Sequence, residues 1–174
     1  MRRWFKFCLA IALAAVLFTQ DQLVLAENQA ATAEDFSKAA KVAKICGEFM
    51  PNNEQAEAEI LKLGFVTERW NGRFHILKSS NQHVLVIISG ADTYDKHCGI
   101  LVDNMSADQA ETLVMPWLDT LQATRSTLGN SLALKRWSGL KDGVRADASV
   151  FETSHHETIE GAWVRLVLTD KPID

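Results

Sequence analysis

The residues best suited to chemistry lie in a polar loop expected over 90–98, which contains Asp92, Thr93, Tyr94, Asp95 and His97. A carboxylate beside a histidine is the smallest pair that can transfer protons in general acid–base catalysis. We therefore expect His97, with Asp92 or Asp95, and the neighbouring Tyr94 to contact a ligand. An ordinary turn is the simpler alternative, because Asp and Thr side chains often bond to their own backbone.

A second candidate is the run His155-His156-Glu157, which we expect in a polar turn over 154–161. Adjacent histidines in a strand point to opposite sides, so only a turn lets them share a metal ion. Zinc requires three or four ligands, and the other histidines are too scattered along the chain to be assigned as partners. The sequence therefore predicts no metal site and no cofactor.

Three tryptophans form the third candidate: Trp70, Trp137 and Trp163. Trp163 alternates with apolar neighbours in the last predicted strand, so it belongs to the face opposite Ala162 and Val164. Tryptophan is favoured in binding hot spots, so we expect Trp163 to bind a partner if that face is uncovered. A second small core on that face is the alternative.

Motifs of the familiar enzyme classes are missing from the chain. It has no G-x-S-x-G elbow, phosphate loop, H-E-x-x-H or C-x-x-C sequence. Whether the protein is an enzyme stays open on this basis, but a protein without catalytic activity is favoured.

The N-terminus has the layout of a secretory signal peptide. A basic start with Arg2, Arg3 and Lys6 precedes an apolar run over 7–18, and Ala26 ends a plausible cleavage site. The apolar run spans roughly 18 Å as a helix, well short of the ~30 Å core of a bilayer. We therefore predict a cleaved signal over 1–26 and an exported, periplasmic or secreted protein without a membrane span. Either the general or the twin-arginine export route is compatible with this start.

Signal cleavage removes Cys8 and leaves Cys46 and Cys98 as the remaining cysteines. Because exported proteins meet an oxidising compartment, we predict a disulfide between these two residues. Two buried thiols are the alternative.

The net charge of the whole chain is −4, and loss of the basic signal makes the remainder more acidic. An acidic protein is poorly suited to bind nucleic acid through electrostatics, so we predict no nucleic-acid partner. The hydrophobic fraction of 47% and charged fraction of 23% fit an ordinary globular domain.

Apolar residues at three- and four-residue spacing predict three helices, over 32–50, 53–63 and 106–121. Thr32, Asn53 and Ser106 are the expected N-caps, and Pro116 is expected to kink or restart the third helix. Apolar runs and alternation predict strands at 65–70, 73–78, 83–89, 98–102, 132–137, 146–150 and 162–169.

We therefore predict one α+β domain over 27–174. It has a mainly antiparallel twisted sheet of about six to seven strands, with two N-terminal helices and one central helix packed on it. The disulfide joins the first helix to the fourth strand.

The favoured function is an exported, disulfide-stapled interaction protein that binds a protein or envelope component without catalysis. An inhibitor or immunity-type protein directed against a basic enzyme is one form of it. The alternative is a small extracytoplasmic hydrolase or ligand-binding enzyme that uses the loop between residues 90 and 98. A structural component of the envelope is a third possibility.

Overall fold

Helices and strands cover most of the chain that the computed structural model describes, namely residues 31–70, 72–90, 92–125, 133–156 and 159–169, without the side chains of 68–70 and 153–156. The helices are α2 (Ala33–Phe49), α3 (Asn53–Leu61) and α4 (Ala107–Leu121). The strands are β1 (Val66–Trp70), β2 (Phe74–Lys78), β3 (Val84–Ser89), β4 (Asp95–Val102), β5 (Thr124–Arg125), β6 (Ala133–Lys141), β7 (Val144–His156) and β8 (Ile159–Thr169).

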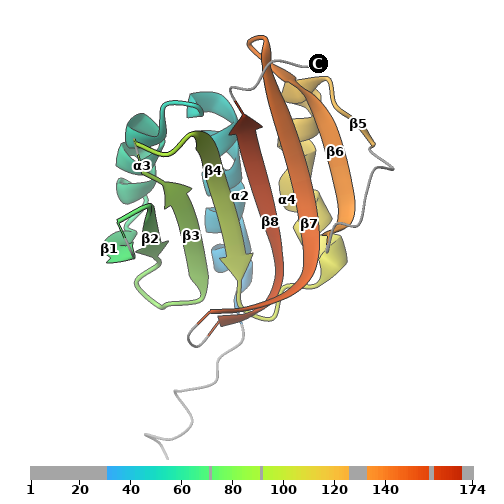
Figure 1. Ribbon diagram of the computed structural model, residues 1–174. Helices are drawn as coiled ribbons and strands as arrows, with labels where there is room; N and C mark the ends of the chain where they lie inside the picture. The colour runs from blue at the N-terminus through green and yellow to red at the C-terminus, as the bar shows by residue number, and fades with distance from the viewer. Residues whose placement is uncertain (1–30, 71, 91, 126–132, 157–158, 170–174) are drawn as a thin grey trace, which may run out of the picture. The chain divides into compact units, whose positions relative to one another are not determined.

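The strands form one sheet in the order β1-β2-β3-β4-β8-β7-β6-β5, and neighbours run antiparallel throughout. Figure 1 shows the three helices on one side of this sheet, behind the strands. The opposite side, which faces the viewer, has no helix among the described residues, and we call it the open face. This arrangement confirms the predicted α+β fold, with eight strands in place of six to seven.

The sheet consists of two halves with the same order of elements. In the first half, α2 and α3 precede a four-stranded antiparallel meander, and in the second half α4 does. The last strands of the two meanders, β4 and β8, pair at the middle of the sheet. The helices α2 and α4 lie behind this central region (Figure 1). Because the halves meet through both layers, the core is continuous across them.

The main core lies between the helices and the sheet. Strand β3 is apolar throughout because both of its faces are covered: Val84, Val86 and Ile88 pack against the main core, while Leu85 belongs to a second, smaller cluster on the open face. In α4, the fully buried Trp117 donates a hydrogen bond from Nε1 to the carbonyl oxygen of Ala43 at 2.5 Å. The helix layer is therefore joined by a polar contact as well as by packing.

The predicted disulfide is present between Cys46 of α2 and Cys98 of β4, with the Cα atoms 6.2 Å apart. Both residues are fully buried in the main core. The bond therefore fastens the first helix of the domain to a central strand, as the sequence predicts.

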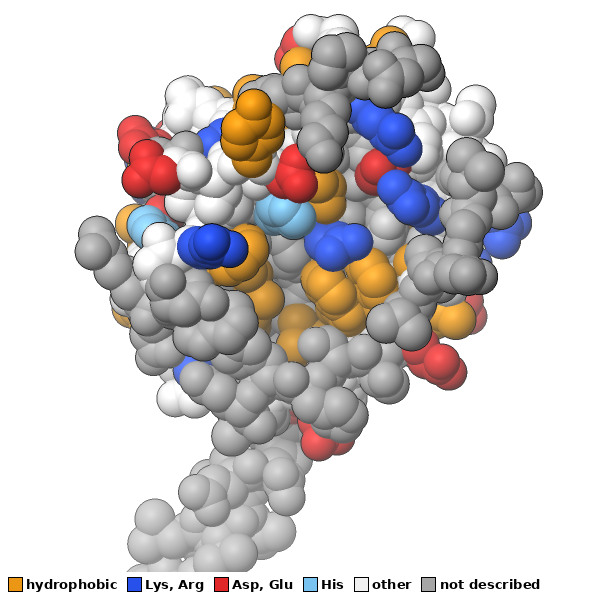
Figure 2. Space-filling view, in the orientation of Figure 1, with side chains coloured by type: hydrophobic (Ala, Val, Ile, Leu, Met, Phe, Trp, Pro, Cys, Tyr) orange, Lys and Arg blue, Asp and Glu red, His pale blue; other side chains and the backbone are white. Residues whose placement is uncertain are grey.

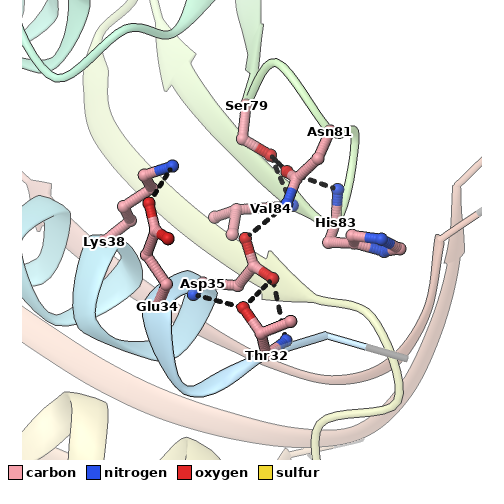
Figure 3. A network of polar contacts seen from close by, with 8 residues as sticks. All are labelled: Thr32, Glu34, Asp35, Lys38, Ser79, Asn81, His83 and Val84. Atoms are coloured by element: carbon pink, nitrogen blue, oxygen red, sulfur yellow. Dashed lines mark hydrogen bonds and ion pairs between the residues drawn. The ribbon is translucent and has the colours of Figure 1, made fainter. Parts of the chain in front are cut away.

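The start of α2 is fixed to the turn between β2 and β3 by the carboxylate of Asp35 (Figure 3). Asp35 and the N-cap Thr32 form a capping box, and the Asn81 side chain donates to Asp35 at 2.7 Å. Burial opposes ionisation of Asp35, but the hydrogen bonds from Asn81 and Thr32 outweigh it and lower its pKa. A polar network thus places the helix on the sheet.

Several predicted boundaries are wrong in ways that have a physical reason. Asn52, rather than Asn53, caps α3, and the helix α4 continues through Pro116 without restarting. Residues 138–141, which lie beyond the strand predicted at 132–137, extend β6, and residues 154–156, expected in a turn, extend β7, because each of these strands pairs with a long antiparallel neighbour. The two-residue strand β5 has no sequence pattern of its own.

Candidate functional site

The expected loop over 90–98 is shorter than predicted, because β4 begins at Asp95 and not at Cys98. Asp95 pairs with Thr169 of β8, and His97 pairs with Val167. Because β4 lies at the middle of the sheet, this pairing extends the strand into the polar segment. Both side chains stand on the open face, opposite to that of Cys98. Asp92 and Tyr94 remain outside the strand, and Tyr94 is 79% exposed.

The four predicted residues line one cavity of about 810 Å³, beside the start of α3 and the adjacent ends of β2, β3 and β4. Its lining also includes Asn53, Glu57, Phe74, His75 and Ser89. Asn53 is buried and donates from Nδ2 to the backbone oxygen and the hydroxyl of Ser89, at 2.6 and 2.7 Å. These bonds tie α3 to the end of β3 and form the wall of the cavity.

His97 is half-buried at the border between the cavity and the open face. Its ring lies edge-on to Phe74, with centroids 5.9 Å apart, and its backbone N–H donates to the Ser89 hydroxyl at 2.9 Å. Burial and the charge of Arg165 lower the pKa of His97, and the weaker effect of Asp95 opposes them. The imidazole is therefore held neutral near pH 7, the form that can accept a proton or a hydrogen bond.

A histidine–carboxylate pair that the sequence did not predict lies in the same cavity. Glu57 of α3 approaches Nδ1 of His75 at 2.7 Å and accepts a hydrogen bond from Thr67 at 3.2 Å. Glu57 belongs to the helix predicted over 53–63, and its side chain is only 18% exposed. Residues 18 positions apart meet here because α3 packs over β1 and β2.

The open face has an aromatic pair beside an arginine. Phe151 of β7 and Trp163 of β8 stack with their ring centroids 4.2 Å apart. The guanidinium carbon of Arg165 lies 5.0 Å from the centre of the Phe151 ring and 5.8 Å from that of Trp163. Figure 2 looks onto this face and shows hydrophobic side chains near its middle, with basic side chains and a histidine beside them.

Trp163 is partly buried, because it packs against the second hydrophobic cluster of Ile76, Leu85, Leu101 and Ile159. The small second core that the sequence left as an alternative is therefore present. Trp163 still belongs to the open face, which no described helix covers. Whether it binds a partner stays a prediction.

One carboxylate on the open face is shared by several donors. Asp147 of β7 accepts hydrogen bonds from Arg136 at 2.7 Å and from Ser138 at 2.5 Å, and Arg145 lies 3.6 Å away. Burial raises the pKa of Asp147, but the bonds from Ser138 and Arg136 and the charges of both arginines lower it overall. Asp147 therefore stays ionised and orients Arg136.

Arg165 differs from Arg136 in its partners. Among the described residues, no carboxylate lies within ion-pair distance of Arg165, and its buried Nε has no hydrogen-bond partner. Burial and the neighbouring charge of Arg136 lower the pKa of Arg165, against a smaller effect of Asp147. The positive charge of the half-buried Arg165 on the open face is thus poorly neutralised by the side chains around it.

The other residues singled out in the sequence do not join this site. Trp137 is buried in the main core on the helix side of the sheet. The side chains of Trp70, His155 and His156 and all of Glu157 lie outside the described residues. Within the described ranges, no three His, Cys, Asp or Glu side chains gather as metal ligands.

The described helices are all too short or too polar to cross a membrane. Comparisons with protein-family models, with curated proteins and with solved structures found no match for this chain.

Proposed function

We propose that this protein is an exported, disulfide-stapled binding protein that holds its partner on the open face of the sheet and does not catalyse a reaction. The observation that supports this most is the half-buried Arg165 beside the Phe151–Trp163 stack, on a face that no described helix covers. The uncovered face of an antiparallel sheet is ordinarily polar. Aromatic residues and arginine are the types enriched where proteins bind partners.

Export is the part of this proposal that rests on the N-terminal sequence. The buried Cys46–Cys98 disulfide is compatible with an oxidising compartment, where such bonds persist. Expression of the full chain in an exporting bacterial host, followed by N-terminal sequencing, tests it. We expect a mature chain that begins at Glu27, and an uncleaved chain retained in the cytoplasm contradicts export.

The face itself is tested by capture of a partner with matched variants. Immobilised wild-type protein is incubated with envelope extract, and the Phe151→Ala variant is compared with Met115→Ala. Met115 is 50% exposed on α4, on the other side of the sheet, so its replacement is the control. We expect the wild type and Met115→Ala to retain the same partner and Phe151→Ala to lose it, with all three folded by circular dichroism. Equal capture by all three contradicts the proposal.

The basic side chains of the open face favour an acidic partner. An inhibitor or immunity-type role directed against a basic enzyme therefore receives no support from this face. A partner with exposed carboxylates or phosphates suits Arg165 and Arg136 better.

The second candidate function, a small hydrolase or ligand-binding enzyme, is favoured by the cavity lined by Asp92, Tyr94, Asp95 and His97. A neutral imidazole beside a carboxylate can act as a general base. Turnover of chromogenic ester, phosphate-ester, peptide and glycoside substrates tests it, with the double variant Asp95→Ala and His97→Ala as comparison. Hydrolysis by the wild type that the double variant lacks establishes an enzyme, and no hydrolysis by either supports the binding protein.

A further inference from the structure

Positive charge is concentrated on the open face, although the whole chain has a net charge of −4. Arg136, Arg145 and Arg165 all stand on this face, and Asp147 is the carboxylate that contacts two of them. These three arginines outnumber Asp95 and Asp147, the two aspartates described on the same face, so the local field is opposite in sign to the net charge of the chain. Such a field attracts anions.

The strand register places Arg165 and Arg136 on either side of Ser149. Arg165 pairs with Ser149 across β7 and β8, and Ser149 pairs with Arg136 across β7 and β6. The two arginine backbones are therefore separated by two strand spacings, roughly 10 Å. This is a distance that two long side chains can bridge when they bind the same small anion.

Both of these arginines have an unused donor. The Nε atoms of Arg165 and Arg136 are buried, and neither has a hydrogen-bond partner within the described part of the chain. A buried donor without a partner is destabilising, and two neighbouring guanidinium groups repel each other. An oxyanion beside the two guanidinium groups offsets their repulsion, because it supplies the opposite charge.

The neighbouring row of the open face is apolar. Phe151 pairs with Trp163, which in turn pairs with Leu101 of β4, one step along the strands from the arginine row. Ile159, near the far end of β8, packs in the same cluster as Ile76 of β2. This packing continues the apolar row of the open face from β8 to β2.

We propose that the open face binds a small amphiphilic anion, a carboxylate or phosphate monoester joined to an apolar chain or ring. Its oxyanion lies between Arg165 and Arg136, and its apolar part lies against Phe151 and Trp163. This inference rests on the proposed function and names the ligand class of that face. Extended polyanions such as nucleic acids fit less well, because they need basic residues along a much longer track.

Titration of the mature protein with four probes tests the proposal: decanoate below its micellar concentration, decanol, inorganic phosphate and phosphatidylglycerol vesicles. The NMR signals of the arginine Nε–H groups report on the anion site directly, and calorimetry gives the affinity. We expect saturable binding of decanoate with shifts of the Arg165 and Arg136 signals, and much weaker binding of the other three probes.

The matched variants are Arg165→Gln on the open face and Lys38→Gln on α2, which remove the same charge. Lys38 pairs with Glu34 on α2, on the helix side of the sheet, so its loss leaves the open face intact. We expect Arg165→Gln to weaken decanoate binding by about tenfold or more, since charged hydrogen bonds are lost, and Lys38→Gln to leave it unchanged. Unchanged binding by a folded Arg165→Gln variant overturns the proposal.

The other probes separate the parts of the inference. If decanol binds as tightly as decanoate, the ligand does not need a negative charge. If phosphate binds as tightly as decanoate, the ligand does not need an apolar part. Binding to vesicles alone contradicts a free small molecule as the ligand. If no probe binds while partner capture still depends on Phe151, this inference fails and the proposed function stands. If no probe binds and partner capture does not depend on Phe151, both this inference and the proposed function are wrong.

Discussion

Cys46 and Cys98, 52 residues apart in the chain, are joined by a disulfide at the centre of the core. The bond connects α2 to a strand with neighbours on both sides, so it restricts the unfolded chain across most of the first half. In the chain-entropy description, a loop of this length contributes about 4 kcal/mol.

Replacement of both cysteines by alanine is therefore expected to lower the free energy of unfolding by about 4 kcal/mol. Urea unfolding of the wild type and the double variant measures this change. The reduced wild type is the control and is expected to resemble the double variant. Identical unfolding of the oxidised and reduced wild type contradicts the prediction.

The packing of α2 against α4 depends on a close fit at Gly47. A Cβ atom added at Gly47 comes within 2.9 Å of Cδ1 of Trp117, whose buried ring is held by its bond to Ala43. Alanine in a helix interior ordinarily stabilises by about 1 kcal/mol relative to glycine, but here the clash is expected to reverse the sign.

Gly47→Ala is thus expected to destabilise the protein by about 1–3 kcal/mol in urea or thermal unfolding. In a Trp117→Phe background, Gly47→Ala is expected to cost less than it does in the wild type, because the smaller ring leaves room for the added Cβ. A Gly47→Ala variant as stable as the wild type would show that the two helices adjust without cost.

Asp35 makes stability depend on pH. Its pKa is lowered in the folded protein from an ordinary value of 3.8. A carboxyl group of this kind stabilises the fold at pH values above 3.8, and the contribution is lost as the pH falls through the lower, folded-state pKa.

Asp35→Asn is expected to cost about 1–3 kcal/mol at pH 7, because the bonds to Thr32 and Asn81 are disturbed. The difference from the wild type should shrink as the pH falls below about 4, since the wild-type carboxyl is then protonated too. Urea unfolding between pH 3 and 7 measures both curves. A constant difference over this range would assign the effect to packing rather than to charge.

His97 is expected to titrate below its ordinary pKa of 6.5, because burial and Arg165 disfavour the imidazolium. NMR titration of the imidazole signals measures this value. In Arg165→Gln, loss of the neighbouring positive charge is expected to raise the pKa of His97. A value that does not move in that variant means that burial alone is responsible.

The helices were predictable because their capping signals are local, and the disulfide was predictable because the expected domain over 27–174 contains two cysteines. Thr32 and Ser106 form capping boxes with residues three positions later, and the pairing of Cys46 with Cys98 follows once Cys8 is assigned to the predicted signal peptide. The continuous apolar run of β3 likewise indicates a strand covered on both faces.

The open-face site was not predictable in the same way. Arg136, Asp147 and Arg165 come from three strands, and they meet only because β6, β7 and β8 are neighbours in the sheet. The alternation around Trp163 does place Arg165 on the same side as that tryptophan. The early start of β4 was missed because it depends on pairing with β8, some 70 residues later in the sequence.

The two halves of the sheet are connected by a single passage of the chain, over residues 103–106 between β4 and α4. Both cysteines of the disulfide lie in the first half. A backbone cut in this passage therefore leaves two fragments that associate through the β4–β8 pairing, the helix layer and the second cluster, in which Ile159 packs with Ile76. The protein is thus suited to reconstitution from separately expressed fragments, with assembly reported by recovery of the fold.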